Sequence, residues 1–464
     1  MSRRPPVDPN AGRVPAGALG PRPLVAIVGR PNVGKSTLFN RLSGQRLAIV
    51  EDLPGVTRDR NYAGAWALGK EYVLVDTGGF DPESDDPMRA GIATHVQLAI
   101  EECDVVLCVL DATTDPMPAD REAVALLRRS DKPVLYVANK ADSPGRALGA
   151  TAHYELGLDA VLPVSALHGR GLGELEEALC RALPEPERSS EATGDDATEG
   201  VPRVAIVGRP NAGKSSLVNA LAGEERQLVD ARAGTTIDSV DTLVVRDGRP
   251  LVLIDTAGIR RKRAKKSGVE TLSILQAIRA IERSDVVVLL IDAAAGVGEQ
   301  DAKIAGLAVD RGRALVLAMN KTDLLARGEE KRAMDRAREV LAFVPWAPMV
   351  TLSATESKGI APLLGRVHDA VDAHRTRVTT GELNRFFEQV LETHPPPSMN
   401  NRPVRLYYIT QALAKPPTFI IVTNEPKGVH FSYQRYVANQ IRKRFGFRGT
   451  PVRVFYRGKS RKPR

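Results

Sequence analysis

Glycine, lysine and serine occur at a spacing that can hold a phosphate. The segment Gly29-x-x-x-x-Gly34-Lys35-Ser36 directly follows the apolar run Val25–Val28 and opens a segment of helical period. Glycines permit backbone geometries that turn successive N–H groups toward one anion, and a helix N-terminus adds partial positive charge. Lys35 can reach the β- and γ-phosphates, and the Ser36 hydroxyl can ligate Mg²⁺. The segment therefore predicts a nucleoside triphosphate site.

The same segment occurs a second time. At an offset of 179 residues, GRPNVGKS (29–36) matches GRPNAGKS (208–215), and the sequence around both also matches. A single match can be an ordinary glycine-rich turn, but two matches in the same context argue against a turn. A period this long indicates a duplicated domain and not a solenoid repeat. The predicted phosphate-binding residues are Gly29, Arg30, Pro31, Asn32, Val33, Gly34, Lys35, Ser36 and Thr37, and then Gly208, Arg209, Pro210, Asn211, Ala212, Gly213, Lys214, Ser215 and Ser216.

Two later segments predict which base is bound. Asn139-Lys-Ala-Asp142 and Asn320-Lys-Thr-Asp323 each follow an apolar run. A carboxylate accepts two hydrogen bonds from N1–H and the exocyclic amine of guanine, whereas adenine offers neither donor there and would leave the carboxylate unpaired. Serine-alanine pairs further on supply backbone donors near the base oxygen. The predicted base-binding residues are Asn139, Lys140, Asp142, Ser165 and Ala166, and Asn320, Lys321, Asp323, Ser353 and Ala354.

Threonine, aspartate and glycine complete the expected site for GTP, GDP and Mg²⁺. Thr57 and Thr236 each lie 22 residues past the phosphate-loop lysine, although the neighbouring Thr235 competes for the second role. Such a threonine can close over Mg²⁺ when the γ-phosphate is present. The expected Mg²⁺ ligands are Ser36, Thr57, Asp76, Ser215, Thr236 and Asp255, and the expected catalytic residues are Lys35, Thr57, Gly79, Lys214, Thr236 and Gly258. The two segments that face the γ-phosphate are Asp76, Thr77, Gly78, Gly79 and Phe80, and Asp255, Thr256, Ala257, Gly258 and Ile259.

One pair of positions departs from the common GTPase pattern. Many GTPases carry glutamine directly after the glycine that corresponds to Gly79 and Gly258, where the glutamine orients the attacking water. Phe80 and Ile259 occupy these positions here and cannot do so. Intrinsic hydrolysis is therefore expected to be slow unless another group supplies positive charge.

Length and composition limit the architecture. A chain of 464 residues that is 43% hydrophobic suggests about three domains. Short apolar runs alternate with amphipathic helical segments, which predicts doubly wound α/β domains. Three cysteines exclude a disulfide scaffold, and no apolar run approaches the ~20 residues of a membrane span, so we expect a cytoplasmic protein. The expected organisation is a disordered tail (1–22), a first GTPase domain (23–183), an acidic linker (184–201), a second GTPase domain (202–376) and a basic C-terminal domain with its tail (377–464).

The C-terminal domain concentrates positive charge. From Thr380 to Arg464 there are sixteen lysines and arginines against four acids, in a chain whose net charge is +9. This asymmetry favours a polyanionic partner, with a solubilising tail as the alternative. The expected element order is helix 380–392, strands 404–409 and 418–422, helix 433–445 and strand 452–456. Gly446-Phe-Arg-Gly449 is either an RNA backbone clamp or, as we favour, a helix cap that leads into the last strand. We expect RNA contact to use instead the basic face of the helix 433–445, which carries Arg435, Arg442, Lys443 and Arg444.

A second basic segment follows the second nucleotide motif. Residues 260–266 (RRKRAKK) hold six bases in seven positions. They predict either a nucleotide-gated electrostatic contact with a polyanion, which we favour, or a solvated mobile loop.

Together these features resemble the bacterial ribosome-assembly GTPase family Der (EngA). The resemblance rests on the tandem GTPase motifs, the GRPNxGKS loops, the hydrophobic residues after DTxG and the basic αββαβ segment, and it covers roughly residues 23–460. It implies a KH-like C-terminal domain, GTP hydrolysis and a role in maturation of the large (50S) ribosomal subunit through its rRNA. It also implies that Asn32 and Asn211 help to bind K⁺ in place of an arginine finger. We expect a monomer that binds neither membrane nor DNA.

Two other classes share some of these features. A tRNA-modifying GTPase of the MnmE type would have one GTPase domain and a reactive C-terminal cysteine, whereas the last cysteine here is Cys180. An interaction scaffold would bind GTP with little turnover. A membrane-remodelling GTPase would need an amphipathic or lipidation signal, which the sequence lacks.

Overall fold

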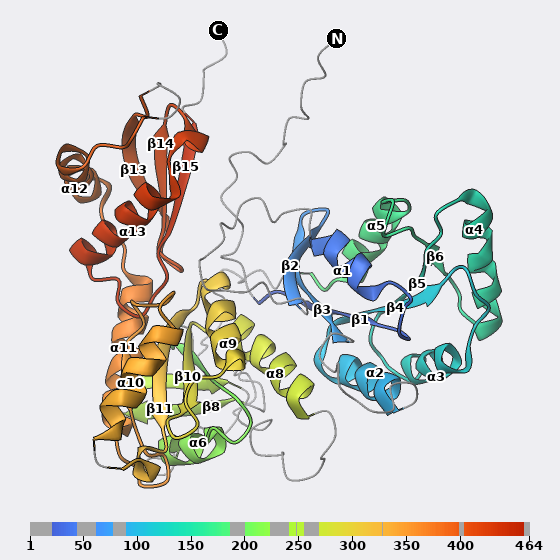
Figure 1. Cartoon of the computed structure of the whole chain (residues 1–464), viewed down its shortest axis with the longest axis horizontal. Helices are drawn as coiled ribbons and strands as arrows, with labels where there is room; N and C mark the ends of the chain where they lie inside the picture. Colours follow the sequence, from blue (N-terminus) through green and yellow to red (C-terminus); the bar gives the residue numbers. More distant parts are fainter. Residues whose placement is uncertain are drawn as a thin grey trace. The chain divides into compact units, whose positions relative to one another are not determined.

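The computed structural model describes residues 21–43, 62–77, 90–185, 200–222, 241–246, 248–254, 269–326, 328–398 and 403–458. These residues form three sheets (Figure 1) and two compact units. One unit holds the described residues up to 185 together with 269–282, and the other holds the remaining described residues. Within the described ranges, no helix is both long and apolar enough to cross a membrane.

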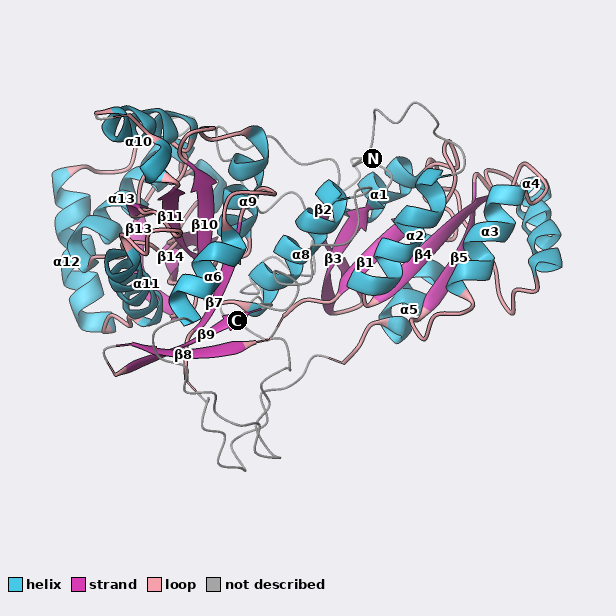
Figure 2. Ribbon diagram, turned by 90° about the horizontal axis from the view of Figure 1, so that it is seen from below, coloured by secondary structure: helices cyan, strands magenta, loops and turns pink. Residues whose placement is uncertain are grey.

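The first sheet confirms the expected doubly wound domain. Its strand order is β2-β3-β1-β4-β5-β6, with only β2 antiparallel to its neighbour. Helices cover both faces (Figure 2), and the central strands β1 and β4 are accordingly buried along their whole length. The elements are β1 (Leu24–Val28), α1 (Lys35–Ser43), β2 (Tyr62–Ala67), β3 (Lys70–Asp76), α2 (Ala90–Glu102), β4 (Val105–Asp111), α3 (Pro118–Leu127), β5 (Val134–Asn139), α4 (Pro144–Gly149), η2 (Ala150–Leu156), β6 (Leu162–Pro163) and α5 (Leu172–Ala182).

The second sheet repeats this arrangement. Its order, β8-β9-β7-β10-β11-β12, places each strand where its counterpart lies in the first sheet. Side chains of the helices after β7 and after β12 share one apolar core with the sheet. The elements are β7 (Arg203–Val207), α6 (Lys214–Ala222), β8 (Thr242–Arg246), β9 (Arg249–Ile254), α8 (Val269–Arg283), β10 (Val286–Asp292), α9 (Glu299–Asp310), β11 (Ala314–Asn320), η3 (Thr322–Leu324), α10 (Glu329–Val340), β12 (Met349–Thr351) and α11 (Ile360–Arg375).

The third sheet belongs to the basic C-terminal domain. Its elements are α12 (Thr380–Thr393), β13 (Leu406–Leu413), β14 (Thr418–Thr423), η4 (Pro426–Gly428), α13 (Phe431–Phe445) and β15 (Arg453–Gly458). The expected αββαβ order is confirmed, although β13 begins two residues later than predicted and runs four residues further. Strand β14 is central, antiparallel to β13 and parallel to β15. The helices cover one face over a core that includes Leu383, Phe387 and Phe419.

The C-terminal domain contacts the second GTPase fold within the same unit. The backbone N–H of Leu315 in β11 donates to the carbonyl of Gly449 (2.8 Å), and the N–H of Gly449 donates to the carbonyl of Trp346 (3.0 Å). The imidazole of His374 lies 2.8 Å from the Thr450 hydroxyl, with both residues buried. Backbone hydrogen bonds therefore join the two folds directly.

Candidate functional site

The glycines of both phosphate loops are required by close backbone contacts. Gly29 and Gly34 have φ of +143° and +90°, a region that L side chains rarely adopt. A Cβ on Gly29 would collide with the carbonyl of Val109, and one on Gly34 would collide with the amide of Asn139. Gly208 and Gly213 meet the corresponding atoms of β10 and Asn320. In both copies the loop lies tightly against the carboxyl ends of the parallel strands, where ligands of such sheets bind.

The phosphate-loop lysines lie along their own loops. The Lys35 ammonium donates to the carbonyl of Arg30 (2.9 Å), and that of Lys214 donates to the carbonyls of Gly208 (2.6 Å) and Arg209 (2.7 Å). Burial lowers the pKa of Lys35, while the Asp76 carboxylate opposes this effect. This desolvation favours pairing with an anion, as a phosphate-binding lysine requires.

Two expected Mg²⁺ ligands meet in the first domain. The Ser36 hydroxyl donates to a carboxylate oxygen of Asp76 at 3.0 Å, and Asp76 is 1% exposed. Helix α1 supplies the serine and the end of β3 supplies the aspartate. A hydroxyl and a carboxylate are the oxygen donors that Mg²⁺ prefers, so these residues fit the ion.

The asparagines of the base-recognition segments bridge loops. The Asn139 amide donates to the carbonyl of Val33 (2.9 Å) and accepts from the N–H of Ala166 (3.0 Å). Asn320 makes the same two bonds, to Ala212 (2.8 Å) and from Ala354 (3.0 Å). Each asparagine thus ties the phosphate loop to the serine-alanine loop and fixes the geometry of both.

The guanine-recognising aspartates differ between the copies. Asp142 accepts from the Ser165 hydroxyl (2.6 Å) and pairs with Arg146 (3.0 Å). The Ser165 hydrogen bond is the main cause that lowers the pKa of Asp142, which keeps the carboxylate ionised to accept from guanine. In the second copy Asp323 is exposed, and the Ser353 hydroxyl is shared with Thr355 (3.1 Å).

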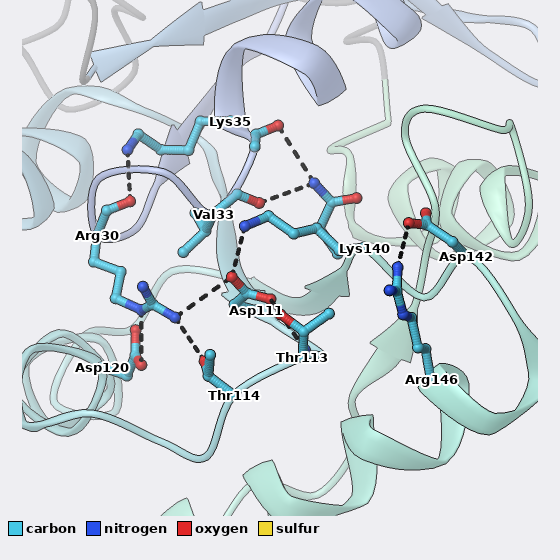
Figure 3. A network of polar contacts seen from close by, with 12 residues as sticks. Arg30, Val33, Lys35, Asp111, Thr113, Thr114, Asp120, Lys140, Asp142 and Arg146 are labelled. Atoms are coloured by element: carbon cyan, nitrogen blue, oxygen red, sulfur yellow. Dashed lines mark hydrogen bonds and ion pairs between the residues drawn. The ribbon is translucent and has the colours of Figure 1, made fainter.

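An ionic network behind the phosphate loop was not predicted from the sequence (Figure 3). Arg30 pairs with Asp120 (3.4 Å) and Asp111 (3.6 Å), and Lys140 pairs with Asp111 (2.7 Å). Hydrogen bonds from Lys140 and Thr113 lower the pKa of Asp111 although burial alone would raise it. The network connects the phosphate loop to the base-recognition segment.

The network recurs in the second copy. Arg209 pairs with the fully buried Asp301 (2.7 Å), and Lys321 pairs with Asp292 (2.6 Å). The internal repeat held the signal for this network, because Asp111 and Asp120 align with Asp292 and Asp301 at one common offset of 181.

Several predicted site residues lie outside the described ranges, and their roles stay predictions. They are Thr57, Gly78, Gly79, Phe80, Thr236, Asp255, Thr256, Ala257, Gly258, Ile259 and the basic segment 260–266. In the described ranges, hydrogen bonds of Asn139 and Asn320 bring each phosphate loop and its base-recognition segments together. No group of histidine, cysteine or acidic side chains that could hold a metal ion was found among the described residues.

The comparisons with known proteins agree with this geometry. A family model described as 50S ribosome-binding GTPase matches residues 24–140 and again 203–321. A second model, the KH-domain-like C-terminal region of EngA bacterial GTPase enzymes, matches residues 377–457. GTPase Der of Moorella thermoacetica is 47% identical over 95% of this chain and 100% of its own length. GTPase Der of Syntrophotalea carbinolica is 44% identical over 94% and 99%.

The chain belongs to the GTPase Der family. It is therefore a GTPase with two P-loop domains and an EngA-type KH-like domain, as the sequence predicted. In this Der-family chain the Gly446–Gly449 segment is a helix cap. Gly446 ends α13 in the left-handed region (φ +72°), and Gly449 contacts the second GTPase domain.

Proposed function

We propose that this GTPase binds the large ribosomal subunit during its assembly and that bound nucleotide controls the association. The observation that best supports the proposal is the direct joining of a nucleotide-binding fold to the basic domain through Leu315 and Gly449. A change at the second nucleotide site can reach the RNA-facing domain through this contact. The matched description "50S ribosome-binding GTPase" supports the same partner. The proposal includes that the protein acts in the cytoplasm and as a monomer.

Each described site residue has a distinct task in GTP hydrolysis. Lys35 and Lys214 neutralise phosphate charge, and the loop N–H groups orient the phosphates. Asp142 and Asp323 select guanine, while Asn139 and Asn320 hold the loops together. Mg²⁺, when bound by Ser36 and Asp76, supplies charge that stabilises the leaving phosphate.

We also assign a potassium ion to each site. Asn32 and Asn211 adopt left-handed backbone conformations, with φ of +65° and +63°, at the outer turn of the loop. A monovalent cation held beside them would offset the charge that develops between the β- and γ-phosphates. It would compensate for Arg30 and Arg209, whose guanidinium groups are paired with buried aspartates behind the loop.

Co-sedimentation tests the proposed partner. Full-length protein is loaded with a non-hydrolysable GTP analogue or with GDP and centrifuged with purified large and small subunits across a salt series. We expect nucleotide-dependent association with large subunits that weakens with salt, because phosphate contacts release counterions. Lys214→Ala should abolish the nucleotide dependence. Equal association in both nucleotide states, or with both subunits, would contradict the proposal.

A further inference from the structure

The segment Gly446–Gly449, which has the GxxG sequence of an RNA backbone clamp, contacts the second GTPase domain and cannot bind RNA in this chain. Gly449 exchanges backbone hydrogen bonds with Leu315 and Trp346 of the second GTPase domain. Phe447 is fully buried, and Arg442 donates to the carbonyl of Thr450 (2.6 Å) while its guanidinium lies over the Trp346 ring (5.0 Å). Arg442 was expected on the RNA-facing side of α13 and is instead largely buried at this contact. RNA contact by this domain must therefore use another surface.

Strand register identifies a second face of the three-stranded sheet. Ile409 pairs with Ile421, which pairs with Tyr456, and both isoleucines are fully buried beneath the helices. Side chains of neighbouring rows point to the opposite face. The side chains of the cross-strand pairs immediately before and after Ile409, Ile421 and Tyr456 therefore project away from α12 and α13.

This opposite face carries aromatic and cationic side chains. Tyr408 pairs with Val422, which pairs with Arg457, and in the next row Ile420 pairs with Phe455. Tyr408 is 51% exposed, Arg457 is exposed and Phe455 is partly exposed. Tyr408 and Phe455 lie on the two edge strands, about 12 Å apart along the diagonal of the sheet. We name Tyr408, Phe455 and Arg457 the sheet-face cluster.

We propose that the sheet-face cluster binds single-stranded RNA by stacking bases on Tyr408 and Phe455 while Arg457 contacts the phosphate backbone. Aromatic rings spaced across a sheet offer separate platforms to successive unpaired bases, and a nearby arginine supplies the complementary charge. The surrounding domain is strongly basic, which favours a polyanion over an apolar protein segment. This inference deepens the proposed function, because it assigns the form of rRNA that the domain recognises.

The test measures binding of a fluorescein-labelled oligouridine of about 12 nucleotides to the full chain by anisotropy. Tyr408→Ala should weaken binding by about tenfold, and Tyr408→Phe should restore it because the ring face is retained. Tyr154→Ala, an equally exposed tyrosine of the first GTPase domain, is the control and should bind normally. Arg457→Gln should lower the slope of log K against log salt by about 0.7.

The outcomes separate this inference from the proposed function. Unchanged binding by Tyr408→Ala, no binding by the wild-type chain, or equal competition by a duplex of the same sequence would overturn the stacking site. None of these results bears on co-sedimentation of the wild-type protein with large subunits. Loss of nucleotide-dependent sedimentation with intact oligouridine binding would instead overturn the proposed function alone.

Discussion

Arg30 of the first phosphate loop and the buried Asp120 of α3 form an ion pair, and Arg209 and Asp301 repeat it in the second domain. Each guanidinium group thus links the loop that carries a phosphate-binding lysine to a buried carboxylate of the same domain. We refer to this ion pair as the brace of the loop.

Removing this brace should loosen the site and the fold. Asp120→Asn removes one of the two buried carboxylates that pair with Arg30, so we expect the first domain to lose about 2 kcal/mol of stability and about tenfold in GTP affinity. Affinity is measured with a fluorescent GTP analogue in a Lys214→Ala background, which silences the other site. Asp115→Asn, an exposed neighbour, is the matched control. A variant with normal affinity and melting temperature would show that the pair is dispensable.

The two nucleotide sites should fail independently. Lys35→Ala or Lys214→Ala removes a charge-assisted contact to the phosphates and should weaken GTP binding at that site by about 10- to 100-fold. Isothermal titration calorimetry of the full chain should then show one remaining tight site. Lys331→Ala, on the exposed face of α10, should leave both sites intact. Two unaltered sites in both loop variants would refute the assignment.

Base preference should follow the two aspartates. Asp142→Asn and Asp323→Asn replace an acceptor pair with an amide that suits xanthine, so guanine affinity should drop about 100-fold while xanthosine triphosphate binding improves. The decisive measurement is competition between the two nucleotides at each site. Asp159→Asn is the control, since Asp159 is exposed and is not one of the predicted base-binding residues. Retained guanine preference in the double variant would refute the assigned role.

Stability of the contact between the second GTPase domain and the KH-like domain should depend on pH. Burial lowers the pKa of His374 to about 4, although Asp285 opposes the effect, and Arg313, Lys415 and Arg375 reinforce it. The unfolded chain, with a histidine pKa of about 6.5, binds more protons between these values. The contribution of neutral His374 to the free energy of unfolding is therefore fully present above about pH 6.5, and the free energy of unfolding should decrease by about 2 kcal/mol on going to about pH 5.

Trp346 fluorescence reports this contact in a Trp66→Phe background, which leaves a single tryptophan. Urea unfolding is measured at both pH values. His374→Gln should be less stable at neutral pH and should lose most of the pH dependence. An equal pH dependence in the variant would assign the effect to other groups.

Potassium should accelerate hydrolysis. Replacing K⁺ with Na⁺ should slow single-turnover hydrolysis about tenfold, because a smaller ion fits the site beside Asn32 and Asn211 less well. Asn32→Ala should remove the K⁺ effect at the first site, assayed with Lys214→Ala to silence the second. Equal rates in both salts would rule out the cation.

The duplicated fold was predictable because the central parallel strands are apolar over most of their length and each motif recurs in order. Asp142 and Lys35 were predicted as site residues from residue type and spacing alone. The ion pair between Arg30 and Asp120 was not predicted, because an aspartate near the start of a helix looks like an ordinary helix cap in the sequence. Asp120 does serve as a cap, since it accepts from the N–H of Met117. Arg442 was misplaced for a similar reason: helical periodicity reveals a basic face but not the ring of Trp346, 96 residues earlier.

The Gly446–Thr450 segment has one further consequence. Its backbone hydrogen bonds to Leu315 of β11, an interior strand of the second nucleotide-binding sheet, and to Trp346 hold the KH-like domain to the second GTPase domain at this boundary. Any rotation of the second GTPase domain during GTP turnover would then turn the KH-like domain with it. The second GTPase domain would therefore set the orientation of the KH-like domain on a ribosomal particle.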